Sequence, residues 1–250
     1  MNPRWSKAQA RVSHWLATHW RVERFRLRNK TPMVSFTFDD LPKSAATTGA
    51  RLLDAHGARG TFYISGALVG TTSPQWDFID AEDILALHAR GHEIGCHTFS
   101  HERACDLDEA SLGFEIEQNR RYFASLAPSI EVENFAYPFG FGSILRKRQL
   151  KAAFRSCRSI VPGVNCGDVD LQFLQAMPLI ESRIDRDGIE RAFDQAQTNN
   201  GWLIFYGHDV VDRPSPWGCS PALLHHALEA ANRRQIPALT MTEALQCAGA

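Results

Sequence analysis

The sequence predicts one α/β domain built around a parallel sheet, either open or closed into a barrel. Short β-rich segments alternate with segments of helical periodicity over about 220 residues, a pattern typical of parallel sheets. The 250 residues suffice for one large core, and the 44% hydrophobic and 22% charged residues are typical of a globular protein. The sequence contains no internal repeat, low-complexity tract or linker.

Residues 1–30 differ in charge from the rest of the chain. They carry eight lysines and arginines against Glu23 alone, whereas the whole chain has a net charge of −1. Apolar residues recur there at helical spacing, from Trp5 through Val12 and Trp15 to Trp20. We therefore expect a basic, helical extension at 1–30, ahead of one domain at 31–250. This helix either packs on the domain or contacts a membrane surface or an anionic polymer.

The expected strands are short, apolar and β-branched or aromatic, and glycines and capping residues bound the expected helices. Gly57 and Gly91 end two helices, and Asp106 or Asp108 caps a third. The expected strands lie at 33–38, 61–64, 93–96, 135–137, 157–161, 201–206 and 237–240. The expected helices lie at 45–56, 80–90, 107–126, 188–198, 221–234 and 242–247.

Composition narrows the cellular context. No segment is long and apolar enough to span a membrane, and polar residues interrupt any signal-like stretch near the start, so we expect a cytoplasmic chain. A net charge of −1 gives no reason to expect a nucleic-acid partner. The six cysteines form no C-x-x-C pair, which favours free thiols over a disulfide framework.

Polar residues follow directly after three of the expected strands. Asp39 and Asp40 come after the first, His97 after the strand at 93–96, and His208 after the strand at 201–206. The carboxyl ends of parallel strands meet at one edge of a sheet, where α/β proteins bind ligands. The sequence therefore predicts a functional site at this edge.

The residue types at these positions suit a metal ion. His97 and His101 are four residues apart and would share one face if the segment turned helical, although Thr98 stands where a zincin has its glutamate base. Neighbouring side chains on a strand point apart, so Asp39 and Asp40 would have different roles. One carboxylate and two histidines leave coordination positions for water and substrate. Taken singly, each motif also fits surface histidines or a capped turn.

Four segments resemble, in order and spacing, the signature of the polysaccharide deacetylases, the family 4 carbohydrate esterases. The segments are T-F-D-D at 37–40, H-T-F-S-H at 97–101, F-A-Y-P-F-G at 135–140 and L-I-F-Y-G-H at 203–208. The resemblance covers about residues 33–245. It implies a distorted (β/α) barrel with about seven parallel strands.

The resemblance also implies a reaction and a role for each residue. Asp39 would be the general base, His208 the general acid, and the backbone N–H of Phe139 an oxyanion donor. One divalent metal, zinc or otherwise cobalt, nickel or manganese, would be held by Asp40, His97 and His101. The chain would be a metal-dependent hydrolase of C–N amide bonds that removes N-acetyl groups from an amino-sugar polysaccharide or oligosaccharide.

The third motif departs from the family pattern R-x-P-Y. Ala136 replaces the arginine that orients the base, and Phe139 replaces the tyrosine. We expect Arg158 or Arg183 to pair with Asp39 instead. The aspartate that orients the acid histidine in the family is expected at Asp168 or Asp170.

Several other functions stay open on the sequence. The first is an amidase or deformylase of the same fold that acts on a small or lipid-linked substrate. The second is a carbohydrate-binding protein without activity, which the two departures would favour. An iron oxygenase fits less well, because Asp39 and His208 would have no role. A glycosidase with Asp39 and Asp40 as its acid pair is disfavoured, because strand neighbours cannot flank one bond across about 5 Å.

Overall fold

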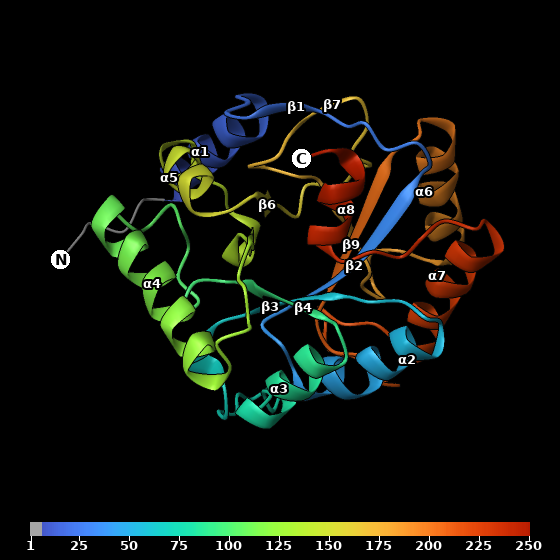
Figure 1. The fold of residues 1–250 in the computed structure, drawn as a ribbon, viewed down its shortest axis with the longest axis horizontal. Coiled ribbons are helices and arrows are strands. Elements are labelled where there is room, and N and C mark those ends of the chain that lie inside the picture. The colour runs from blue at the N-terminus through green and yellow to red at the C-terminus, as the bar shows by residue number, and fades with distance from the viewer. Residues whose placement is uncertain (1–6) are drawn as a thin grey trace.

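The computed structural model describes residues 7–250, centred on a seven-stranded sheet (Figure 1). All neighbouring strands run parallel, in the order β6-β5-β4-β3-β2-β9-β8. The strands are β2 Met33–Asp39, β3 Thr61–Ile64, β4 Glu93–Cys96, β5 Asn134–Ala136, β6 Ser156–Arg158, β8 Met177–Pro178 and β9 Trp202–Gly207. Two further strands, β1 Arg24–Arg26 and β7 Asp168–Asp170, pair antiparallel in a separate small sheet.

Strands β2 and β9 are the two longest strands of the sheet, and both are covered on both faces. Every residue of β2 and β9 is buried, as expected for near-continuous apolar strands in a parallel sheet. Their pairing runs from Met33 opposite Trp202 to Phe38 opposite Gly207. Because β2 and β9 pair in this register, Asp39 and His208 emerge at the same end of two neighbouring strands.

The irregular segment 171–176 lies between β6 and β8, the two ends of the sheet. Ser159 N–H donates to the Leu174 carbonyl at 2.8 Å, so this segment pairs with β6 and its continuation. Farther along, Met177 pairs with Phe205 of β9. The sheet therefore curls round toward itself. The predicted distorted (β/α) barrel with about seven parallel strands is confirmed.

Helices surround the sheet, with α4, α3, α2, α7 and α6 on its outside (Figure 1). The α-helices are α1 Lys7–His19, α2 Ala50–Ala55, α3 Ala81–Ala89, α4 Glu109–Leu126, α5 Ile144–Ala153, α6 Arg186–Thr198, α7 Pro221–Arg233 and α8 Met241–Ala248. The shorter helical turns are η1 Ala45–Gly49, η2 Gly66–Leu68 and η3 Pro138–Gly140. Asp108, one of the two predicted caps, accepts the Ser111 N–H at the start of α4. No helix within 7–250 has the length and apolarity needed to cross a membrane.

Buried polar contacts tie the N-terminal segment to the rest of the chain. The Lys147 ammonium on α5 donates to the carbonyls of Ala17 (2.7 Å) and Trp20 (2.9 Å) and pairs with Asp170. Asp170 in turn accepts the N–H groups of Val22 and Glu23. Trp5, the first apolar position of the predicted helix, lies outside the described residues. The domain boundary at residue 30 stays a prediction.

Two kinds of element differ from the sequence-based expectation. The strand expected at 237–240 is wrong, because only Ala238 bridges to β2, at Val34. Helix α5 was not expected, because its sequence ILRKRQLKAA carries four basic residues that obscure its apolar stripe. The helix forms all the same, since Lys147 finds buried acceptors and Leu150 packs in the core. All six cysteines are free, and four of them are buried.

Candidate metal and catalytic site

The end of β2 directs two adjacent aspartates to different partners. Asp39 is still in register with Tyr63 of β3, but Asp40 and Leu41 both have left-handed backbone conformations, with φ of 59° and 61°. Two successive non-glycine residues in this region are uncommon. The turn is held by the complete burial of Leu41 and by the Leu41 N–H, which donates to the Asp39 carbonyl at 2.6 Å. It separates the two carboxylates, as the sequence predicted.

Two histidines meet Asp40 just beyond β4. His97 Nε2 lies 3.3 Å and His101 Nε2 lies 2.8 Å from Asp40 Oδ1. Their proximity does not come from a helical turn, which was the expected route. Thr98 and His101 have φ of 58° and 56°, so an irregular turn with two left-handed residues brings the rings to 5.0 Å. The sequence predicted the partners correctly and the backbone conformation wrongly.

The three side chains fit a divalent metal by their chemistry. One nitrogen or oxygen from each lies within 4.8 Å of the others. His97 Nδ1 is 2.8 Å from the Ala136 carbonyl, which can only accept, so Nδ1 carries the proton and the Nε2 lone pair faces Asp40. Asp40 Oδ1 is buried, and the polar atoms that face it are the Nε2 atoms of His97 and His101. Two imidazoles and one carboxylate form a typical donor set for zinc and similar ions.

Charge at Asp40 also suits a cation. Burial by itself would raise the pKa of the Asp40 carboxyl, but the adjacent His101 and His97 rings outweigh it and hold this pKa well below its usual range. Asp40 is therefore ionised at neutral pH.

A buried glutamate on α4 supports the histidine turn. Glu115 Oε2 accepts the N–H groups of Phe99 (2.8 Å) and Ser100 (2.7 Å), and Oε1 accepts the Ser100 hydroxyl at 3.0 Å. These bonds fix the segment between the two histidines. Sequence analysis missed Glu115, although a carboxylate on the same helix face as the core residues Leu112 and Ile116 was a usable signal.

Asp39 pairs with Arg158 in the interior. Arg158 Nη2 donates to Asp39 Oδ1, and both side chains are buried. The guanidinium also lies over the rings of Tyr63 and Tyr206, at 5.2 and 5.4 Å from their centroids. The prediction that Arg158 or Arg183 pairs with Asp39 is confirmed for Arg158. Arg183 instead contacts the Tyr206 hydroxyl at 3.5 Å.

The register of two strands explains the absence of an arginine at position 136. Ala136 on β5 lies directly opposite Arg158 on β6. The small side chain at 136 and the large cation at 158 are therefore cross-strand neighbours. In the family pattern the arginine would stand at position 136, on β5. In this chain Arg158, on the neighbouring strand β6, supplies the guanidinium that pairs with Asp39.

His208 follows β9 and approaches the other carboxylate oxygen of Asp40. Its Nε2 lies 3.7 Å from Asp40 Oδ2, and its ring stacks on Trp76 with 5.6 Å between centroids. Its Nδ1 is 3.1 Å from the Trp217 carbonyl. Asp209 holds the following loop, since it accepts the N–H and the hydroxyl of Ser215.

The expectation that Asp168 or Asp170 orients His208 is wrong. Asp168 is exposed in β7 beside Arg26, and Asp170 accepts bonds from Lys147 and the N-terminal segment. A backbone carbonyl fulfils that role. Nothing in the sequence marks a carbonyl oxygen, so this partner of His208 has no sequence signal.

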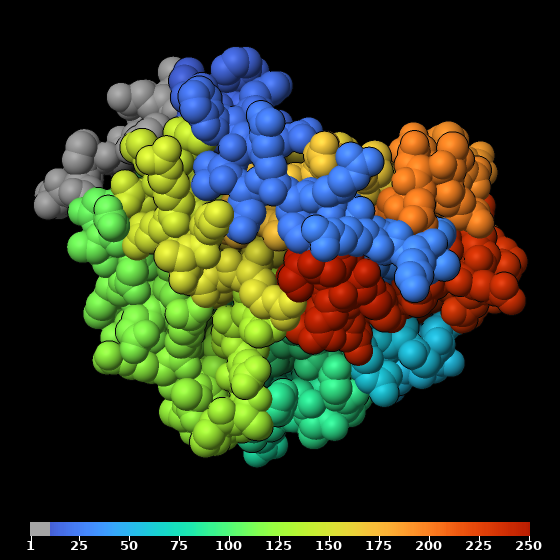
Figure 2. All heavy atoms as spheres, turned by 45° about the horizontal axis from the view of Figure 1, so that its top comes forward, coloured from blue at the N-terminus to red at the C-terminus, as the bar shows by residue number. Residues whose placement is uncertain are grey.

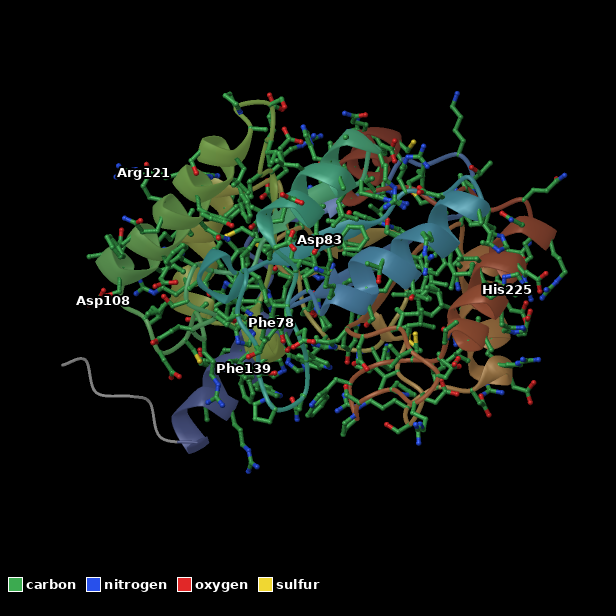
Figure 3. The ribbon with its side chains drawn as sticks, turned by 90° about the horizontal axis from the view of Figure 1, so that it is seen from below. Phe78, Asp83, Asp108, Arg121, Phe139 and His225 are labelled. Carbon is green, nitrogen blue, oxygen red and sulfur yellow. The ribbon has the colours of Figure 1, made fainter. Side chains whose placement is uncertain are left out.

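Phe139 lies at the rim of the same site. Its ring is 4.5 Å from the His101 ring, and the Arg103 guanidinium lies over the Phe139 ring, 5.1 Å from its centroid. It has φ of 57° within the short turn η3, which reverses the chain after β5. Figure 3 shows Phe139 on the lower edge of the molecule, beside α1. The turn brings the Phe139 ring against one ring of the histidine pair.

Comparison with known proteins identifies relatives. The model of the polysaccharide deacetylase family matches residues 26–155. A chitin deacetylase from Pestalotiopsis sp is 31% identical over 84 residues, which are 34% of this chain and 26% of that protein. A gellan lyase from Bacillus sp is 28% identical over 135 residues, or 53% of this chain and 5% of that protein. The chain thus spans about a quarter or less of these relatives.

Solved structures share the fold at low sequence identity. A family 4 acetyl xylan esterase from Clostridium thermocellum, in complex with a cobalt ion, has a TM-score of 0.60 and 21% identity, with 86% of this chain and 90% of that chain covered. A family 4 pseudoenzyme from Bacillus anthracis has a TM-score of 0.59 and 15% identity, with 88% and 68% covered. Since the family model also matches just over half of the sequence, the chain belongs to the polysaccharide deacetylase family.

Proposed function

We propose that this chain is a metal-dependent hydrolase that removes N-acetyl groups from an amino-sugar polysaccharide or oligosaccharide. One divalent ion, zinc or else cobalt, nickel or manganese, would be held by Asp40, His97 and His101. The single observation that carries the proposal is the convergence of three donor atoms on one point beside a separate, arginine-held carboxylate. The cobalt complex of the acetyl xylan esterase, a protein of the same fold, supports the metal.

The ion and Asp39 would share the activation of water. A divalent ion there would act as a Lewis acid on the acetyl carbonyl and make a bound water more acidic. Asp39 is the general base and accepts the proton of the attacking water. The pairing with Arg158 holds the Asp39 carboxylate in one orientation, so it needs no reorganisation during the reaction.

His208 would protonate the leaving amine. Because its Nδ1 faces a carbonyl oxygen, Nδ1 carries a hydrogen, and Nε2 is the nitrogen that faces the ligand cluster. In the imidazolium form, Nε2–H is therefore the proton available to the leaving nitrogen. The backbone N–H of Phe139 would stabilise negative charge on the former carbonyl oxygen. The products are acetate and a free amino sugar.

Two rival functions use the same fold. A carbohydrate-binding protein without activity is favoured by the similarity to a pseudoenzyme and by Ala136. Arg158 weakens it, because the missing guanidinium is restored at Asp39. An amidase or deformylase acting on a small or lipid-linked substrate is the second rival. Comparing the rates of hydrolysis of chito-oligosaccharides and of small formamides distinguishes the deacetylase from the amidase or deformylase. The metal content of the purified protein distinguishes both enzymes from the binding protein.

Acetate release from N-acetylated chito-oligosaccharides tests the proposal. Asp39→Asn and His208→Ala should each lower kcat about 100-fold or more. Asp168→Asn and His225→Ala are matched controls, because both side chains are exposed and pair with Arg26 and Glu229 rather than with site residues. Both variants should retain wild-type rates. Near-wild-type activity of either site variant would refute the assigned roles.

A further inference from the structure

Helix α1 presents apolar side chains to solvent. Val12, Trp15 and Trp20 are 58%, 58% and 64% exposed, although groups of large apolar residues are usually buried. Leu145 on the neighbouring helix α5 is 59% exposed. Figure 1 shows α1 and α5 next to each other at one edge of the molecule, and buried Lys147 on α5 donates to carbonyls of α1 and the residue after it.

The opposite side of α1 packs against the rest of the domain. Ala17 and Ser13 are buried, and His14 Nδ1 accepts the Gly142 N–H at 3.3 Å. Val12 and Trp15 follow each other by three residues and therefore lie on one side of the helix, away from these contacts. The helix cannot rotate to cover them without breaking its bonds to the domain.

Exposed basic side chains occur on the same two helices and in the segment that follows α1. We define the α1–α5 face as Val12, Trp15, Trp20 and Leu145 together with the exposed basic residues Arg11, Arg21, Arg148 and Lys151. Neither α1 nor α5 contains an acidic residue. Glu23, the only acid nearby in the N-terminal segment, is half-buried and lies 3.3 Å from Lys151. Figure 2 shows atoms of the N-terminal segment and of α5 in one continuous surface.

We propose that the α1–α5 face docks on an anionic lipid bilayer, with α1 lying in the plane of the interface. Tryptophan favours the headgroup region, where its ring is apolar and its N–H stays hydrated. Exposed arginine and lysine are attracted to anionic headgroups. Helix α1 has 13 residues, about 20 Å of helix, so it lies on the bilayer rather than crossing it.

The same face fits an anionic polysaccharide less well. Sugars bind tryptophan through its open ring face, but the His19 ring stacks on Trp15 with 4.6 Å between centroids and 28° between planes. Val12 and Leu145 are aliphatic and offer a sugar neither stacking nor hydrogen bonds, whereas acyl chains gain from them. A bilayer uses every residue type on the face.

Docking there would place α1 between the bilayer and the loop that carries Phe139. His14 accepts the Gly142 N–H, and its ring is 5.6 Å from the Phe141 ring, so α1 packs on the loop that carries Phe139. In Figure 3, α1 and Phe139 lie at the same edge. Docking goes beyond the proposed hydrolysis and can be measured without any activity.

Vesicle sedimentation tests the proposal directly. Wild-type protein should sediment with phosphatidylcholine vesicles in which about one lipid in three is phosphatidylglycerol, and binding should weaken in high salt and with phosphatidylcholine alone. Trp15→Ser/Trp20→Ser should bind at least about tenfold more weakly. Arg11→Gln/Arg148→Gln should lose about fivefold per charge, which corresponds to about 1 kcal/mol each.

The controls change exposed residues elsewhere on the surface. Leu85→Ser on α3 and Arg51→Gln/Arg186→Gln on α2 and α6 should bind vesicles like wild type. Circular dichroism of each variant separates lost docking from lost folding. If the tryptophan variant unfolds, the charge variant still tests docking. Three outcomes would overturn the proposal: no vesicle binding by wild type, equal loss in controls and face variants, or retention only on an anionic polysaccharide such as hyaluronate.

Discussion

Replacing Arg158 by methionine should destabilise the protein by about 3–5 kcal/mol, because it leaves the Asp39 carboxylate buried without a partner. The magnitude follows from burial: the Arg158 side chain is 0% exposed and the Asp39 side chain 5% exposed, so water cannot replace the lost cation. The variant also loses the contacts of the guanidinium with Tyr63 and Tyr206, each about 0.5–2 kcal/mol, part of which methionine restores by packing.

A double-mutant cycle isolates the charge effect. Asp39→Asn/Arg158→Met leaves no unpaired charge. Its loss in free energy of unfolding should therefore be smaller than the sum of the losses of the two single variants, by a coupling energy of at least about 2 kcal/mol. Urea unfolding monitored by circular dichroism gives the four free energies. Arg183→Met is the matched control and should cost less than about 1 kcal/mol, because Arg183 is exposed. A cost below about 1 kcal/mol for Arg158→Met, or additive losses, would refute the reasoning.

Two other predictions concern residues around the site and the core. Glu115→Ala should lower metal affinity about 10–100-fold and the free energy of unfolding by about 2–5 kcal/mol, because two backbone N–H groups lose their acceptor. Calorimetric titration with zinc measures the affinity, and Glu115→Gln should retain most of what Glu115→Ala loses. Burial lowers the pKa of His92 to about 4 from 6.5, so between these pH values the unfolded chain binds a proton that the native protein does not. Stability should therefore fall by up to about 3 kcal/mol as the pH drops through that window, and urea unfolding at several pH values should show a flatter dependence for His92→Asn; parallel curves would contradict this.

Much of the fold could be predicted because its strongest elements carry local signals. Strands β2 and β9 are continuous apolar runs, and α4 begins at an aspartate cap. The weak elements carry none: β8 has two residues, and α5 buries Lys147 through acceptors that are distant in sequence. Residues 237–240 look like a strand by composition, but only one bridge to β2 forms.

The site was predictable in its residues and not in its geometry. Asp40, His97 and His208 follow strands, so one sheet edge had to bring them together. The left-handed turn at Thr98 has no sequence signal, because threonine rarely adopts it. The Asp39 pairing depends on the register that puts Arg158 opposite Ala136, and register between distant strands is a property of the folded sheet.

Anomalous diffraction from a crystal soaked with zinc or cobalt tests the central claim most directly. One strong peak is expected about 2.0–2.2 Å from Asp40 Oδ1, His97 Nε2 and His101 Nε2. The peak should be lost in Asp40→Asn and kept in Asp168→Asn. A peak bound by other residues, or no peak in a crystal whose ligand side chains are ordered and accessible, would contradict it.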